Sequence, residues 1–143
     1  MPGQIVVLMV TTLIENKGRY LVLKRSRKNL TNKGKWQFPE GKVKFGEELK
    51  KALKREVEEE TNLVVTDAKL IGIHSSILRR TKSIFRMFRT IFSCKVSGKV
   101  KLSRDHNEYK WIDKKELEKL NVIESFNLND IISVKKLTKK YNS

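Results

Sequence analysis

The alternation of apolar and polar positions predicts that the chain begins with strands. Ile5–Ile14 is rich in β-branched residues, and the polar turn Asn16-Lys17-Gly18 separates it from a second apolar run, Tyr20–Leu23. Two such runs joined at a glycine are typical of a β-hairpin. The next stretch, Lys24–Lys35, is polar and basic without a clear period. We therefore expect an exposed loop there, anchored by the aromatic residues of Trp36-Gln-Phe-Pro39.

The middle of the chain predicts one long helix followed by further strands. Glu47–Thr61 is rich in Glu, Leu, Lys and Ala and contains no Gly or Pro. Asn62 is expected to end this helix, because asparagine tolerates the left-handed backbone found just past helix ends. Strands are expected at Leu63–Thr66, Leu70–Ser75, Ile84–Val96 and Tyr109–Ile112, and helices from Asp113 to Leu120 and from Asn129, with Ile132, Leu137 and Tyr141 on one face. This order predicts a mixed α/β (α+β) fold in which residues 1–143 form a single domain.

Charge and cysteine content narrow the choice of partners and compartment. The chain has 32 basic and 16 acidic residues, a net charge of +16, which favours nucleotides, nucleic acid or an acidic membrane surface as partners. The single cysteine, Cys94, excludes an internal disulfide and is typical of a reducing compartment, so we expect a cytoplasmic protein. The apolar run at Ile5–Ile14 is too short to span a bilayer, and neither a signal peptide nor a membrane anchor is expected.

Acidic residues gather in one stretch of this basic chain. Seven of the 16 lie between Glu40 and Glu60. The apolar side chains of the expected helix share one stripe, made of Leu49, Ala52, Leu53 and Val57. Glu56 and Glu60 fall inside that stripe, Glu59 lies at its edge and Glu58 on the far side. Inward carboxylates repel each other, so they need cations between them. Mg²⁺ suits such oxygen ligands, with Mn²⁺ as an alternative, whereas a solvated helix face is the other interpretation.

The spacing of these residues resembles a known motif. From Gly41 the chain reads GKVKFGEELKKALKREVEEETNL, which is similar to the Nudix box GX5EX7REUXEEXGU, where U is a bulky aliphatic residue. Its positions are filled by Gly41, Glu47, Arg55, Glu56, Val57, Glu59, Glu60 and Leu63. Asn62 replaces the usual glycine, and Glu40 stands where many members of the family also have glycine. The resemblance extends to the flanking Tyr20–Arg25 and Glu108–Ile112 and implies the Nudix fold, an α/β/α sandwich with a mixed β-sheet.

Similarity to Nudix hydrolases implies metal-assisted attack of water on the pyrophosphate of a nucleoside diphosphate derivative. The resemblance assigns metal binding and catalysis to three carboxylates, those of Glu56, Glu59 and Glu60, with the carbonyl of Gly41 as a further metal ligand. It gives Arg55 and Glu47 a supporting role: Arg55 would hold the carboxylates, and Glu47 would be its partner or bind metal-bound water.

The general base varies within the family, which recruits it from the box or from a loop beyond the sheet. Glu108 is the leading loop residue here, and Asp105 is the reserve. Arg25 and Lys42 are placed to bind phosphate oxygens of the substrate.

The substrate class is inferred by eliminating subfamilies whose characteristic residues are absent. The proline that often accompanies ADP-ribose hydrolysis and the tyrosine that often accompanies dinucleoside polyphosphates are both absent from Leu78–Thr81. We therefore expect a MutT-like enzyme that converts a (deoxy)nucleoside triphosphate to the monophosphate and pyrophosphate. Hydrolysis of ADP-ribose or a nucleotide sugar is an alternative.

A basic run predicts a second class of function. Basic and aromatic residues interleave there: Arg79, Arg80, Lys82, Phe85, Arg86, Phe88, Arg89 and Phe92. This pattern is compatible with RNA binding, either by an RNA 5′-end pyrophosphohydrolase or by an RNA-binding Nudix-fold module. The interpretation we favour is a strand whose alternate positions turn Phe inward and Arg outward. Many Nudix relatives are dimers, so a homodimer is a further expectation of the resemblance.

Overall fold

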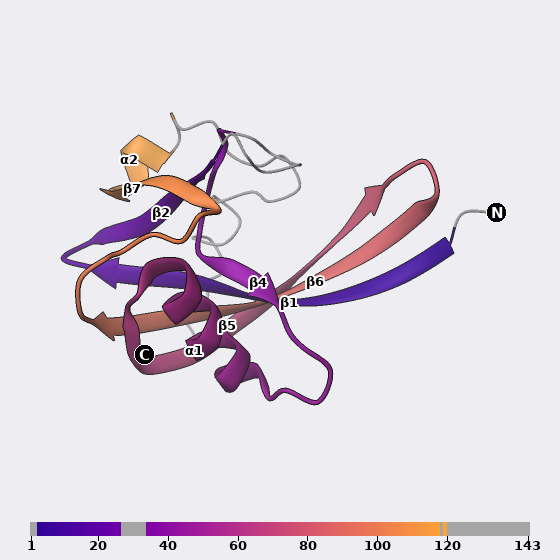
Figure 1. Ribbon diagram of the computed structural model, residues 1–143, viewed down its shortest axis with the longest axis horizontal. Helices are drawn as coiled ribbons and strands as arrows, with labels where there is room; N and C mark the ends of the chain where they lie inside the picture. Colours follow the sequence, from indigo (N-terminus) through magenta and orange to yellow (C-terminus); the bar gives the residue numbers. More distant parts are fainter. Residues whose placement is uncertain (1–2, 27–33, 118, 120–143) are drawn as a thin grey trace.

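The computed structural model describes residues 3–26, 34–117 and 119. Its elements are β1 (Gly3–Asn16), β2 (Arg19–Arg25), β3 (Trp36–Gln37), β4 (Glu40–Lys42), α1 (Leu49–Thr61), β5 (Val64–Arg79), β6 (Ser83–Ser97), β7 (His106–Ile112) and α2 (Lys114–Leu117). The strands follow the order β3-β2-β1-β6-β5, with β4 paired to β1 and β7 to β2. Because β1 and β6 are parallel and the other pairs antiparallel, the expected mixed sheet is confirmed (Figure 1).

The helix α1 covers one face of this sheet. Its fully buried residues Ala52, Leu53 and Val57 share a core with Val10 of β1 and Phe92 of β6. A second core, which includes Leu13, Trp36 and Phe38, lies on the opposite face. Since side chains alternate along a strand, residues of β1 and β6 divide between these two cores. The single cysteine, Cys94, is buried, and burial raises the pKa of its thiol to about 12.

Both ends of α1 follow from local side-chain chemistry. The helix begins at Leu49, two residues later than expected. Glu47 is held in the preceding loop, where its carboxylate accepts hydrogen bonds from the Lys44 backbone at 3.0 Å and from Arg55. Asn62 ends the helix in the left-handed conformation with φ 64°, and its N–H donates to the Glu58 carbonyl at 2.8 Å. The expected role of Asn62 is thereby confirmed.

Two expected boundaries were wrong. The runs expected as separate strands at Leu63–Thr66 and Leu70–Ser75 are one strand, β5, which begins at Val64. Its register against β6 shifts twice, so that pairing continues through the polar residues between the two runs. Lys24 and Arg25 are not in a loop but pair with Glu108 and His106 of β7. The helix expected after Asp113 is confirmed as α2, and Asp113 caps it by accepting a hydrogen bond from the Glu116 N–H at 2.9 Å. Its expected end at Leu120 and the helix expected from Asn129 lie outside the described residues.

Beyond α1 the sheet continues as a projecting three-stranded arm (Figure 1). We define the arm as Gly3–Leu8 of β1, Ile73–Arg79 of β5 and Ser83–Phe88 of β6. Here β1 has β6 as its partner, because β4 pairs only with residues 9–11 and β2 only with residues 15–16. Large apolar side chains are exposed on the arm, namely Ile5, Val6, Leu8, Ile73 and Ile77. Within the described part of the chain, no helix is long and apolar enough to cross a membrane.

Candidate active site

The site is built where β4 lies beside β1 and under α1. Gly41 pairs with Val10, and a Cβ atom at Gly41 would fall on the carboxyl group of Glu56. The absence of a side chain thus allows a carboxylate from α1 to lie directly against the backbone of β4. Burial raises the pKa of Glu56, while Arg55 opposes this rise. The structure therefore brings together two of the expected metal-binding positions.

Arg55 holds the acidic residues around it. Its Nε and Nη2 atoms donate to both carboxylate oxygens of Glu47 at 2.8 and 2.9 Å, and Nη1 donates to Glu56 at 2.8 Å and Glu59 at 3.3 Å. Nη2 also donates to the Lys42 carbonyl at 3.1 Å. Hydrogen bonds from Arg55 and the Lys44 backbone lower the pKa of Glu47 to about 2. The guanidinium ties the loop before α1 to the carboxylates of the helix.

Glu60 is the most deeply buried acid of the box. It is 9% exposed, and its Oε2 atom has no hydrogen-bond partner among the described residues. Burial raises its pKa well above the usual value, and the nearby charges of Glu56, Glu40 and Asp105 act in the same direction, whereas Arg25 opposes them. An unpaired buried carboxylate oxygen is costly without a cation. Glu60 therefore offers an oxygen for a positively charged ligand.

The predicted order of exposure along α1 is confirmed. The side chain of Glu56 is 16% exposed and that of Glu59 57% exposed, and Glu58 lies on the exposed side. Within the described residues, no three acidic, His or Cys side chains already form a complete metal-binding set. Arg55 occupies the space between Glu56 and Glu59 in this conformation.

Glu40 forms a buried ion pair that the sequence did not predict. Its Oε2 accepts hydrogen bonds from Thr11 at 2.9 Å and from Arg89 Nε at 3.3 Å, and Arg89 Nη1 also donates to Ser76 at 3.2 Å. The side chains of Arg89 and Glu40 are 4% and 9% exposed. The expectation that every Arg of this strand points outward was therefore wrong.

The spacing of the residues explains this error. Phe85 and Phe88 are three positions apart, as are Arg86 and Arg89, so each pair divides between the two faces of β6. Arg86 therefore shares a face with Phe88, and Arg89 shares the other face with Phe85. The sequence contained one signal for this pair. Glu40 is an acid at a position where many family members have glycine, and an acid there needs a basic partner if it is buried.

The structure brings one of the two predicted phosphate-binding residues to the carboxylates. Arg25 acts electrostatically on both Glu40 and Glu60. Lys42 is exposed beside Gly41, and only its backbone carbonyl contacts Arg55.

The two acids considered as general base occupy different places. Glu108 is in β7 and not in a loop, which corrects the expected position. It lies opposite Lys24, with 3.8 Å between Nζ and Oε2, and Lys24 lies over the ring of Trp36. Trp36 belongs to the core on the face away from α1. Asp105 by contrast acts on Glu60, because the segment around it passes the end of α1, where Ser103 N donates to the Glu60 carbonyl at 3.3 Å.

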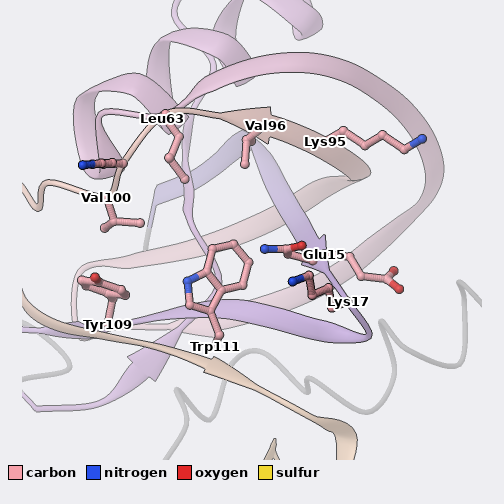
Figure 2. A pocket seen from close by; sticks show the side chains of 11 residues that line it. Glu15, Lys17, Leu63, Lys95, Val96, Val100, Tyr109 and Trp111 are labelled. Carbon is pink, nitrogen blue, oxygen red and sulfur yellow. The ribbon is translucent and has the colours of Figure 1, made fainter.

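A separate cavity is lined by residues of β1, β6 and β7 together with Leu63 (Figure 2). It has a volume of about 740 Å³. Leu63, Val96, Val100 and Trp111 face its interior, and Lys17 and Lys95 lie around it. None of the box carboxylates lines this cavity, so it is distinct from the site around Glu60.

Comparison with known proteins decides the family. The NUDIX domain pattern matches residues 4–129. The chain belongs to the NUDIX domain family. It is 29% identical over 117 residues to the nucleoside triphosphatase NudI of Escherichia coli O139:H28, a match that covers 76% of this chain and 83% of that protein. NudI of Shigella flexneri matches to the same extent.

Solved structures agree with this assignment. The MutT protein from Methanosarcina mazei Go1 superposes with a TM-score of 0.71 at 30% identity, covering 98% of this chain and 97% of the other. The NUDIX domain of Shewanella oneidensis NrtR, complexed with ADP ribose, superposes with a TM-score of 0.70 at 15% identity, covering 95% and 89%. The latter likeness is one of fold. This NUDIX protein is thus a pyrophosphohydrolase that acts on nucleotide derivatives.

Proposed function

We propose that this NUDIX enzyme hydrolyses a (deoxy)nucleoside triphosphate to the monophosphate and pyrophosphate with the help of Mg²⁺. The observation that carries the proposal is the buried Oε2 of Glu60, which lacks a hydrogen-bond partner among the described residues. The nearby charge of Glu56 adds to the effect of burial in raising the pKa of Glu60, so a bound cation would stabilise its charged form.

The residues present are compatible with a divalent metal ion. Glu56, Glu59 and Glu60 would hold it together with the Gly41 carbonyl, a set of hard oxygen ligands typical of Mg²⁺, with Mn²⁺ as an alternative. When bound, such an ion offsets the charge of the pyrophosphate and lowers the pKa of a bound water. Arg55 would keep Glu56 and Glu59 in place through its contacts at 2.8 and 3.3 Å.

Residues around the carboxylates would complete the reaction. Arg25 and Lys42 would bind phosphate oxygens of the substrate. Of the two, Arg25 is the one whose charge acts on Glu60. Attack of water on phosphorus forms one P–O bond and breaks the anhydride bond, so that pyrophosphate leaves and one proton is released. We propose Asp105 as the acceptor of this proton in preference to Glu108, because Glu108 lies on the opposite face of the sheet.

The similarity to NudI supports a triphosphate as substrate, since those relatives are named nucleoside triphosphatases. The NrtR domain was solved with ADP ribose, but an identity of 15% does not support ADP ribose as the substrate of this chain. Hydrolysis at the 5′ end of RNA would use the same carboxylates and belongs in the same test. A cytoplasmic location and a homodimer remain predictions.

The test is a ³¹P NMR assay of the purified protein with Mg²⁺. The panel contains dNTPs, NTPs, ADP-ribose, a nucleotide sugar and 5′-triphosphorylated RNA. We expect monophosphate and pyrophosphate from a nucleoside triphosphate. Glu60→Gln should remove nearly all of this activity, whereas Glu58→Gln, the same chemical change two positions away, should retain it. Equal rates in the two variants would overturn the assignment of the helix face, and turnover of ADP-ribose alone would overturn the substrate.

A further inference from the structure

The arm carries a basic surface without acidic residues. Between Asp67 and Asp105 the sequence contains ten basic residues and no acidic one. Four of the basic residues are exposed at the end of the arm: Arg79, Arg80, Lys82 and Arg86. None of these four forms a salt bridge with an acidic side chain in the described part of the chain, and Arg86 contacts only the neutral Ser75 hydroxyl at 3.3 Å. Their charge is therefore available to a polyanion.

A groove of about 440 Å³ opens among these residues. Its lining consists of Gln4, Ile5, Val6, Ile77, Arg79, Ile84, Arg86 and Phe88. The strand register places Val6, Arg86 and Ile77 in one row across the three strands. Gln4, Ile84 and Arg79 form the next row on the same face. Each row thus contains one guanidinium group and at least one aliphatic side chain.

This face of the arm continues the face that α1 covers. Val10 packs against α1, and Val6 and Leu8 share its side of β1 because side chains alternate. From Val6 to Val10 is about 13 Å along the strand. The loop leading to α1 begins at the same place, where Val43 N donates to the Leu8 carbonyl at 2.9 Å. A ligand on the arm can therefore extend toward the carboxylates.

We propose that this groove binds single-stranded RNA. The guanidinium groups of Arg79 and Arg86 would pair with phosphates, while unstacked bases would lie on the aliphatic floor and Phe88. Single strands expose the base faces that such a floor requires, and RNA is the nucleic acid most often recognised in that form. A second copy of this chain is the weaker occupant, because its arm would bring the same positive charges into contact. The inference goes beyond the proposed function and does not depend on it.

The test is binding of a fluorescent 12-nucleotide RNA, measured by anisotropy from 50 to 200 mM KCl. Four cations on phosphates predict that log K falls with log salt with a slope of about −2.8. The double variant Arg79→Gln/Arg86→Gln should weaken binding by about tenfold or more and reduce the slope by about 1.4. The matched control, Lys95→Gln/Lys99→Gln, removes the same charge at Lys95, roughly 30 Å from Arg86 along β6, and at Lys99, just beyond the end of that strand. It should change affinity less than about threefold.

Two further variants distinguish the contribution of base contacts to RNA affinity from that of charge. Val6 is 71% exposed and Ile77 45% exposed, so Val6→Ser and Ile77→Ser should fold with an unchanged melting temperature. Loss of these apolar side chains from the floor of the groove should weaken RNA binding by roughly 5-fold, the lower end of the range for base stacking, and leave the salt slope as in the wild type.

Several results would overturn the proposal. These are no RNA binding at 50 mM salt, equal losses in the two double variants, or tighter binding of DNA of the same sequence. A dimer in sedimentation that Val6→Ser dissociates would assign the face to a second copy instead. Failure of the proposed function has a different signature: the wild type would bind RNA on the arm yet release no phosphate product from any triphosphate.

Discussion

The carboxyl group of Glu56 occupies the space into which a side chain at Gly41 would project. This relationship explains why the first residue of the box is glycine on structural grounds. We predict that Gly41→Ala displaces Glu56 and lowers kcat by about 10- to 100-fold, the usual cost of disturbing a metal site. The measurement is steady-state release of pyrophosphate at saturating Mg²⁺.

The matched control for this prediction is Gly3→Ala. The nearest atom to a Cβ at Gly3 is a backbone oxygen at 4.0 Å, so this variant should keep its activity and melting temperature. Wild-type kcat in Gly41→Ala would show that Glu56 can be displaced without consequence, and would contradict its assigned role.

Metal-free protein should become less stable as the pH rises, because of Glu60. Burial raises its pKa well above the value in the unfolded chain. The native state therefore binds the proton more tightly, and stability falls from the unfolded-state pKa upward through the native one. In EDTA, Glu60→Gln should melt at least ~3 °C higher than the wild type at pH 7, the shift produced by about 1 kcal/mol. At pH 4 the two should converge, and parallel melting curves across this range would refute the burial of a charged Glu60.

Arg55 should not be replaceable by lysine. Its guanidinium contacts Glu47, Glu56, Glu59 and the Lys42 carbonyl at once, and an ammonium group cannot span these acceptors. We predict that Arg55→Lys lowers kcat by about 10- to 100-fold and raises the pKa of Glu47 from about 2 toward its ordinary value. Steady-state kinetics and NMR titration of Glu47 would measure both. Lys54→Arg, on the exposed side of the helix, is the neutral comparison.

His106 should make the protein sensitive to acid. Gln37 Nε2 lies 2.9 Å from His106 Nε2, and because an amide nitrogen donates, this contact requires the neutral ring. Burial, with help from Arg25, lowers the pKa of His106 to about 4. The unfolded chain takes up the proton first, so stability should decline as the pH falls from about 6.5 to about 4. The loss is at most about 3 kcal/mol. The free energy of unfolding, measured with urea at each pH between about 6.5 and about 4, should change less with pH in His106→Asn than in the wild type.

The general base can be identified by comparing two variants. Asp105 acts on Glu60, whereas Glu108 pairs with Lys24 on the other face of the sheet. Asp105→Asn should lower kcat by roughly 100-fold or more and remove the acidic limb of its pH profile. Glu108→Gln should reduce kcat less than about threefold. The reverse ranking would restore Glu108 as the base.

The helix was predictable from sequence because its signals are local. A 3.6-residue period, favourable composition and Asn62 sufficed to place the carboxylates of Glu56 and Glu60 on the buried side, as the structure confirms. The continuity of β5 was not predictable, since polar residues between two apolar runs normally indicate a turn, and only pairing with β6 carries the strand through them. The contact of Glu40 with Arg89 joins positions 49 residues apart, and no local pattern encodes it. Likewise, the positions of Asp105 and Glu108 depend on how β7 pairs with β2.

The parallel pairing of β1 with β6 has a consequence for biosynthesis. All twelve paired positions, from Gly3↔Ser83 to Ile14↔Cys94, are separated by 80 residues. During synthesis β1 must therefore wait for about 80 further residues before its partner β6 is made, and closing so long a loop slows folding. During that interval its apolar edge is exposed to other nascent chains. Folding yield should therefore depend on translation speed and chaperones more strongly than the stability of the finished domain does.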